Sequence, residues 1–190
     1  LFLFPAAVYF ILFSLLTLQL ITRFSAGYFC DAGDGLQNVW NIWWVSTAWR
    51  LHLSPYFTPF LHAPSGVSLI GHTLNIFNGL VCIPLLHFLS LIQAHNTIVV
   101  FGFVMSGVTA FWLARDFVTS YAAALLAGAL FTFSEFHFAH AQGHLQLVSM
   151  EWLPLAALTL HRFTQAPTAP RGIAAAAALF LNILCDYYYF

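Results

Sequence analysis

The sequence predicts an all-α protein, a polytopic bundle of transmembrane helices. Of its 190 residues 61% are hydrophobic and only 6% are charged, and long apolar segments recur along the chain. Soluble domains carry about 25% charged residues, so soluble, disordered and collagen-like classes are excluded. The net charge of −1 and the lack of lysine give no electrostatic hold on nucleic acid. The expected partner is therefore a lipid bilayer.

The first apolar segment, about residues 2–21, is uncharged and long enough to span a membrane. Residues 22–73 follow as a long outer loop that is too polar to lie in lipid. Within it, residues 36–51 are predicted to form an amphipathic helix lying in the membrane interface, with tryptophans at the level of the headgroups. Its apolar face comprises residues three or four apart: Leu36, Trp40, Trp43, Thr47 and Leu51.

The later apolar segments are predicted to form the rest of one membrane domain covering residues 1–190. They are 74–92, 97–114, 118–134, 147–161 and 172–190. Gly128 is expected at a close contact between helices. Because the chain begins without Met and ends in an apolar run, we expect it to be the N-terminal fragment of a longer protein. Its three cysteines lack CxxC spacing, and no disulfide is expected.

Two topologies remain open. If every apolar segment spans, the 22–73 loop and the 136–146 loop lie on opposite sides, and all five arginines face one side. The positive-inside rule favours this arrangement. If segment 74–92 is re-entrant, as Pro84 and a turn at 93–96 permit, the two loops share the outer side. The cytoplasmic arginines are then Arg115, Arg162 and Arg171.

Two aspartates precede the predicted interfacial helix. Asp31 and Asp34 lie in the stretch Cys-Asp-Ala-Gly-Asp-Gly. A carboxylate at a helix N-terminus can act as a general base or as a metal ligand. It can equally cap the helix, since Asp is among the preferred N-cap residues.

A second cluster of ionisable residues occupies the 136–146 region. Glu135, His137, His140 and His144 crowd this stretch, and Glu151 follows. His140 and His144 are four residues apart, which places two imidazoles on one face of a helix, although Gly143 would interrupt such a helix. The cluster could bind a metal or supply acid, base and hydrogen-bonding groups to a polar ligand. Alternatively, its histidines satisfy helix ends at the interface.

Other candidates are isolated. Arg50 could bind phosphate, or it could extend to the headgroups and favour its helix C-terminus. His72 is one of three histidines spread through the long loop. No Walker loop, GxGxxG, GxSxG or SxxK motif is present, which argues against the corresponding ATPases, dinucleotide-binding enzymes and hydrolases.

The order of these features resembles the uncharacterised bacterial membrane proteins grouped with the GT-C glycosyltransferases. The resemblance rests on the Gly-Asp-Gly at 33–35, the Trp-rich helix, and the His-Thr-Leu-Asn stretch at 72–75. Further along it rests on Gly-His-Leu-Gln-Leu at 143–147 and Glu-Trp-Leu-Pro-Leu at 151–155.

The resemblance implies a GT-C-like fold and a multi-pass protein of the bacterial inner membrane. It also implies sugar transfer, with inversion, from a polyprenyl-phosphate donor to an envelope acceptor at the outer face. Asp34 would be the catalytic acidic residue, with Asp31 as a substitute, and Glu135 or Glu151 would be the second acid. The sequence departs from the family by offering histidines where a paired acid is common.

Positive charge must offset the leaving phosphate in such a reaction. The candidates are Arg50, His72, His140 and His144, or a divalent metal, and no cofactor is otherwise indicated. Two other functions stay open: a transporter or flippase for a lipid-linked sugar, and a non-catalytic subunit of an envelope complex.

Overall fold

The computed structural model describes residues 2–189, which are mostly helical. The first half contains α1 (Leu3–Leu16), α2 (Leu18–Thr22), α3 (Asp34–Arg50), β1 (Phe57–Thr58), β2 (Val67–Ser68) and α4 (Ile76–Leu85). The second half contains α5 (Leu91–Arg115), α6 (Tyr121–Thr132), α7 (Glu135–Gly143), α8 (Leu145–Val148), α9 (Trp152–Gln165), α10 (Ala169–Cys185) and a 3₁₀ turn (Tyr187–Tyr189). The two short strands pair antiparallel, with Phe57 opposite Ser68.

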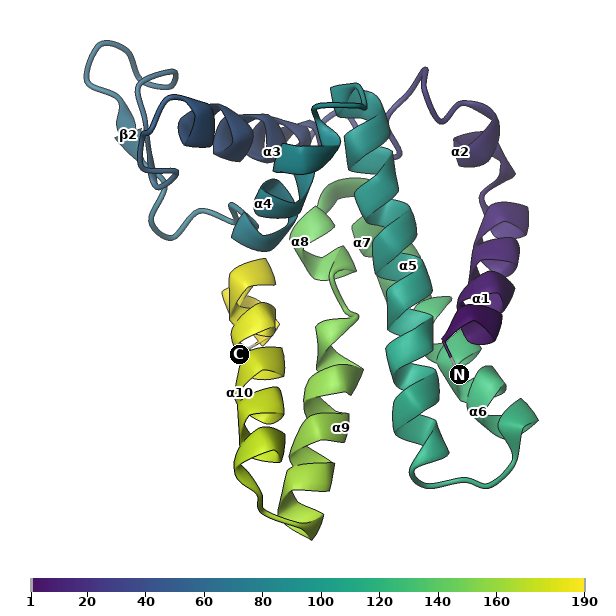
Figure 1. Cartoon of the computed structure of the whole chain (residues 1–190). Helices are drawn as coiled ribbons and strands as arrows, with labels where there is room; N and C mark the ends of the chain where they lie inside the picture. The colour runs from purple at the N-terminus through teal and green to yellow at the C-terminus, as the bar shows by residue number, and fades with distance from the viewer. Residues whose placement is uncertain (1, 190) are drawn as a thin grey trace.

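Helix α5 runs through the middle of the molecule (Figure 1). α1 and α6 pack on one side of it, and α9 and α10 form a hairpin on the other side. α3 lies across one end of this bundle with α4 beneath it, and the β1–β2 hairpin projects beyond α4 as an overhang. The overhang is thus tied to the bundle mainly through α3 and α4.

Serine caps set where three of the helices begin. The Ser90 hydroxyl accepts a hydrogen bond from the Gln93 amide, and the Gln93 side chain accepts one from the Ser90 amide, which is a capping box. α5 therefore begins at Leu91, and the turn expected at 93–96 is wrong. Ser120 and Ser134 cap α6 and α7 more simply, since each hydroxyl accepts a hydrogen bond from the amide three residues later.

The contact of α1 with α5 and α6 depends on small residues. Tyr9 is fully buried, and its hydroxyl donates to the Leu125 carbonyl at 3.0 Å. A Cβ atom at Gly107 would approach the Tyr9 ring to 2.7 Å, and one at Gly128 would approach the Gly107 carbonyl to 2.6 Å. The expected close helix contact at Gly128 is confirmed.

Within residues 2–189, two helical stretches are long and apolar enough to cross a membrane, Leu91–Arg115 and Tyr121–Gly143. The other apolar helices are shorter than the segments predicted for them. α1 ends at Leu16 because Thr17 leaves helical geometry, and α4 has only 10 residues. Spanning helices over the whole of 2–21 and 74–92 are therefore not found.

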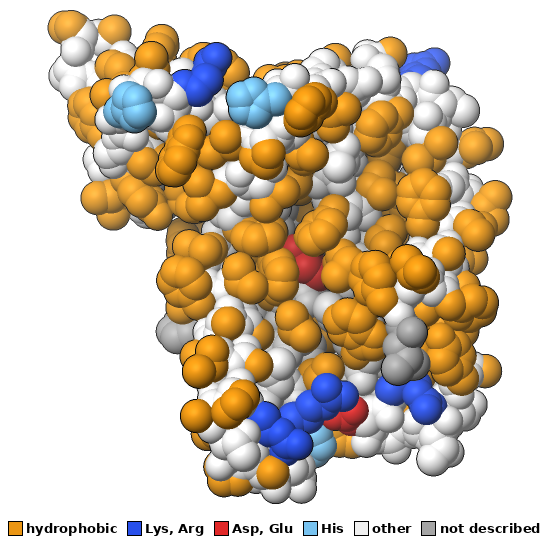
Figure 2. Space-filling model, in the orientation of Figure 1, with side chains coloured by type: hydrophobic (Ala, Val, Ile, Leu, Met, Phe, Trp, Pro, Cys, Tyr) orange, Lys and Arg blue, Asp and Glu red, His pale blue; other side chains and the backbone are white. Residues whose placement is uncertain are grey.

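The structure brings the 22–73 and 136–146 regions together at one end of the bundle, the contact that the second arrangement requires. At one end, the Asp31 amide donates to the Gln142 carbonyl at 2.6 Å, so the 22–73 and 136–146 regions meet. At the other end, Arg162 donates two hydrogen bonds of 2.7 Å to Asp116. Figure 2 shows basic and acidic side chains gathered at this second end, a mainly apolar band above it, and a basic side chain between histidines on the overhang.

The surroundings of α3 correct the predicted interfacial helix. The helix spans nearly the predicted residues, but most of it is buried rather than lying on a surface. Trp44 is fully buried, and its ring lies nearly parallel to that of Trp40 with the centroids 6.0 Å apart. Its indole N–H donates to the Pro55 carbonyl at 2.8 Å. The tryptophans pack under the returning 52–75 segment, and only Trp49 is largely exposed.

Candidate functional site

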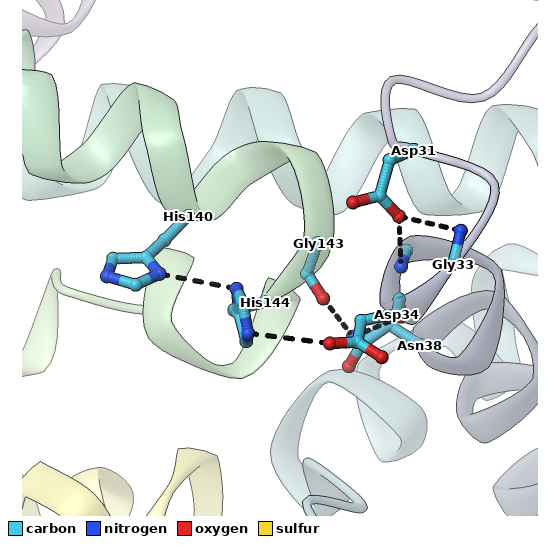
Figure 3. A network of polar contacts seen from close by, with 8 residues as sticks. Asp31, Gly33, Asp34, Asn38, His140, Gly143 and His144 are labelled. Carbon is cyan, nitrogen blue, oxygen red and sulfur yellow. Dashed lines mark hydrogen bonds and ion pairs between the residues drawn. The ribbon is translucent and has the colours of Figure 1, made fainter.

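A pocket of about 340 Å³ opens where the start of α3 meets the α7–α8 corner. Its lining includes Asp34 and Asn38 from α3 and His140, His144 and Gln146 from the corner. Figure 3 shows Asp34, at the start of α3, facing His144 and His140 of the α7–α8 corner, with Asp31 in the loop before α3. Segments about one hundred residues apart in the sequence thus form one polar site.

Asp31 acts as the cap of α3. Its Oδ1 accepts hydrogen bonds from the amides of Gly33 at 3.0 Å and Gly35 at 2.9 Å. Gly35 also permits the close approach of α7, since a Cβ atom there would lie 2.7 Å from the Gln142 carbonyl oxygen. The two aspartates therefore divide the roles that the sequence left open: Asp31 caps the helix, and the Asp34 side chain makes no capping bond.

Asp34 presents its carboxylate to the pocket. Its side chain is 67% exposed, and its Oδ2 lies 3.7 Å from Nε2 of His144. The Nδ1 atoms of His144 and His140 lie 3.4 Å apart. One imidazole of this pair must donate to the other, so Asp34, His144 and His140 form a line of groups that can pass or hold protons.

Two buried side-chain oxygens in the pocket lining have no partner among the described residues. Asn38 is 2% exposed and donates its amide to the carbonyls of Asp34 and Gly143, each at 2.9 Å. Its Oδ1 accepts nothing, and neither does Oε1 of Gln146, which is 3% exposed. A buried unpaired acceptor is costly, so these atoms favour a ligand that brings hydroxyl or N–H donors.

The other predicted site residues lie outside this pocket. His72 lines a neighbouring pocket, with Nε2 at 3.0 Å from Oδ1 of Asn41, and burial lowers the pKa of His72. Arg50 is at the opposite end of α3, about 24 Å from Asp34 at 1.5 Å per residue. Glu135 is exposed at the start of α7, and Glu151 is 1% exposed with neither carboxyl oxygen hydrogen-bonded within residues 2–189.

His137 has a structural role. It is fully buried and stacks on Phe103 with ring centroids 3.8 Å apart. Its ring nitrogens lie 2.8 Å from the Thr132 carbonyl oxygen and 2.9 Å from that of Val148. It thus joins the ends of α6 and α8, behind the face that His140 and His144 present to the pocket.

Within residues 2–189, no three His, Cys, Asp or Glu side chains come close enough together to hold a metal ion. The pocket supplies one carboxylate, and its two imidazoles are already paired with each other. The residues present therefore do not fit a divalent metal in this arrangement.

The sequence did not single out Asn38 or Gln146, which also line the pocket. Amide side chains in a helix carry no signal of their own, because most of them face solvent. The stretch Asp186-Tyr-Tyr-Tyr, at the end of the last apolar segment, could by sequence either line a cavity or form an aromatic belt, and Tyr188 does line the pocket.

No family model, curated protein or solved structure matches the chain. The geometry of the pocket is therefore the main guide to its chemistry.

Proposed function

We propose that this protein is a GT-C-like glycosyltransferase of the bacterial inner membrane, with several membrane passes and its site at the outer face. It would transfer a sugar from a polyprenyl-phosphate donor to an envelope acceptor. The observation that carries the proposal is the convergence of Asp34 and the His144–His140 pair in an open polar pocket at one end of an apolar bundle.

The apolar surface supports a membrane location. Only 22% of the most apolar window of the Tyr121–Gly143 helix is buried. Large apolar side chains on α1 are exposed too, Leu3 to 80% and Leu15 to 69%. A soluble protein would not leave such contiguous apolar faces in water, whereas lipid would cover them.

In this mechanism Asp34 is the general base. Its exposed carboxylate would accept the proton of an acceptor hydroxyl as that oxygen attacks the anomeric carbon, with inversion. The unpaired oxygens of Asn38 and Gln146 would accept hydrogen bonds from sugar hydroxyls and orient the ring. When this pair carries an extra proton, Nε2 of His140 would donate an N–H group to the leaving phosphate and so stabilise its developing charge, while His144 lies between His140 and Asp34.

Arg50 is not assigned to this step. A position about 24 Å away along α3 is too distant for a group that contacts the phosphate of a sugar bound at Asp34. Asp31, through its cap, would hold the Asp34 backbone in place.

The test is transfer by membranes that contain wild-type or Asp34→Asn protein at equal abundance. The probes are polyprenyl-phosphate glucose, mannose and arabinose, each radiolabelled in the sugar, and the readout is label in material that organic solvent does not extract. We expect Asp34→Asn to lose activity at least about 100-fold, the usual contribution of a general base. Asp116→Asn, a matched change at the opposite end, should retain it. Equal transfer by Asp34→Asn and wild type would refute the assignment.

Glu151 favours the second candidate, a transporter of a lipid-linked sugar. A buried carboxyl without partners between helices is typical of ion-coupled transporters. Proteoliposomes holding a fluorescent polyprenyl-phosphate sugar separate the two functions. Accessibility of the donor headgroup to an added quencher would change with time in a transporter, and this change would depend on Glu151 but not on Asp34.

A further inference from the structure

A second groove, of about 530 Å³, lies between the last turns of α3 and the end of α4. Its lining combines cationic or titratable side chains, Arg50, His52 and His87, with apolar ones, including Ile83 and Leu86. It shares no lining residue with the Asp34 pocket. The groove is thus a separate feature that the proposed reaction does not use.

The charged side chain of this groove, Arg50, is positive, and no acidic side chain in the described part of the chain lines the groove. Residues 35–115 contain no Asp or Glu. Within residues 2–189 no hydrogen bond or ion pair to the Arg50 guanidinium is found, whereas Arg162 pairs with Asp116 and Arg115 donates to the carbonyls of Val118 and Thr119. A free guanidinium next to imidazoles matches the geometry and charge of a phosphate group.

His52 occupies a backbone position that usually belongs to glycine. Its φ is +55°, and it follows α3 in a Schellman motif. Its amide donates to the Trp49 carbonyl at 3.2 Å, and the Leu53 amide donates to the Ala48 carbonyl at 2.9 Å. Glycine would adopt this conformation without strain, so a histidine here suggests that its side chain is needed beside Arg50.

Thr47 adds an unused polar group to the wall. It is 5% exposed, and its hydroxyl has no hydrogen-bond partner among the described residues. In helices such a hydroxyl usually bonds to the carbonyl four residues earlier, as Thr97 and Thr109 do at 2.7 and 3.0 Å. An oxygen of a bound ligand would supply the missing partner.

The groove lies where a candidate membrane span begins. His87 precedes the first residue of α5, Leu91, by four positions. Between them Phe88 is 88% exposed, and across the groove Trp49 is 63% exposed. Exposed aromatic rings next to cations at the start of a span are typical of the headgroup level of a bilayer.

We propose that this groove binds the phosphate headgroup of an anionic membrane phospholipid. Arg50, His52 and His87 would donate to the phosphate, and the acyl chains would run past Leu86 and Phe88. The distance from Asp34 separates this lipid from the sugar donor. Its role would be to hold α3 and α4, and with them the overhang, against the membrane, and its binding does not depend on the proposed transfer reaction.

The experiment is native mass spectrometry of the purified full chain, released from micelles doped with phosphatidylglycerol or with phosphatidylcholine. We expect wild-type protein to retain phosphatidylglycerol in preference to phosphatidylcholine. Arg50→Gln should weaken this retention about tenfold or more, since a hydrogen bond to a charged group is lost. The matched control is Arg23→Gln, another exposed arginine near the same end of the bundle, which should retain the lipid.

The variant His52→Gly distinguishes a loss of lipid binding from a folding defect. This change relieves the backbone strain, so it should weaken lipid retention while leaving the thermal unfolding temperature equal to or above that of wild type. Equal retention of the two lipids, or no effect of Arg50→Gln, would overturn the proposal. Displacement of the lipid by millimolar glycerol phosphate would also overturn it, because the groove would then be a site for a soluble phosphate.

Discussion

Replacing Glu151 by glutamine should remove a large part of the pH dependence of stability. Glu151 lies in the break between α8 and α9, outside the two helices long enough to cross a membrane. Burial raises its pKa from 4.5 to about 8. The folded protein therefore holds this proton more tightly than the unfolded chain does, and glutamine mimics the protonated form.

The sign and size follow from linkage. Below pH 4.5 the carboxyl is protonated in both states and does not alter stability. Between pH 4.5 and about 8 the unfolded chain releases the proton and the folded protein retains it, so stability falls as the pH rises. At about 1.4 kcal/mol for each unit, the loss from pH 6 to pH 8 is about 2.5 kcal/mol. For a chain of this size that corresponds to about 5–10 °C in unfolding temperature.

Intrinsic fluorescence of the six tryptophans reports thermal unfolding in detergent at a series of pH values. Wild type should lose unfolding temperature steadily from pH 6 to pH 8, and Glu151→Gln should lose much less. Glu135→Gln is the matched control, because that carboxyl is exposed and its substitution should leave the wild-type slope. Burial also raises the pKa of Asp186, and this residue is unchanged in all three proteins.

Parallel pH profiles for wild type and Glu151→Gln would refute this reasoning. They would mean that the carboxyl is ionised in the folded protein and that its charge is balanced by a cation or water.

Three further predictions concern stability. Asp31→Ala should lower the free energy of unfolding by about 1 kcal/mol through loss of the α3 cap, and Asp31→Asn should lower it less, as measured by thermal unfolding. Gly128→Ala should destabilise by about 1–3 kcal/mol, because the new Cβ meets Tyr9, and a loss below 0.5 kcal/mol in the same assay would contradict that packing. The guanidinium of Arg162 lowers the pKa of Asp116, so the pair stabilises above the ordinary pKa of Asp116 and is lost as pH falls. As an exposed pair it contributes at most about 1 kcal/mol, and an Asp116→Asn variant should differ from wild type at pH 7 but not at pH 2.

The sequence predicted the helical class well because apolar runs and sparse charge report burial or lipid contact directly. It predicted helix ends less well. The beginning of α5 depends on a reciprocal pair of hydrogen bonds between Ser90 and Gln93, and a short polar stretch of this kind resembles a turn. The break after α1 depends on the non-helical backbone conformation of Thr17, and the apolar composition of residues 2–21 does not predict it.

For the site, the sequence singled out the ionisable residues but not how the fold brings them together. Asp34, His140 and His144 were expected to act together only if segment 74–92 failed to span, and the helix found in that segment, α4, has only 10 residues. Composition could not reveal it, because the segment is apolar throughout. The arginine count favoured the other topology, since it weighed Arg23 and Arg50 equally with the three arginines at the opposite end.

Asp34 and Arg50 belong to the same helix but cannot contact the same ligand group. Sixteen residues after Asp34, it was a natural candidate for the same phosphate, but the rigid rise of α3 places the two at opposite ends. The two ends of α3 therefore take part in two different proposed sites. Its N-terminus holds the carboxylate that faces the polar pocket, and its C-terminus holds the free cation at the proposed headgroup site. If both proposals hold, lipid bound at one end of α3 would fix the height of Asp34 relative to the membrane, and with it the depth at which a lipid-linked sugar must present its anomeric carbon.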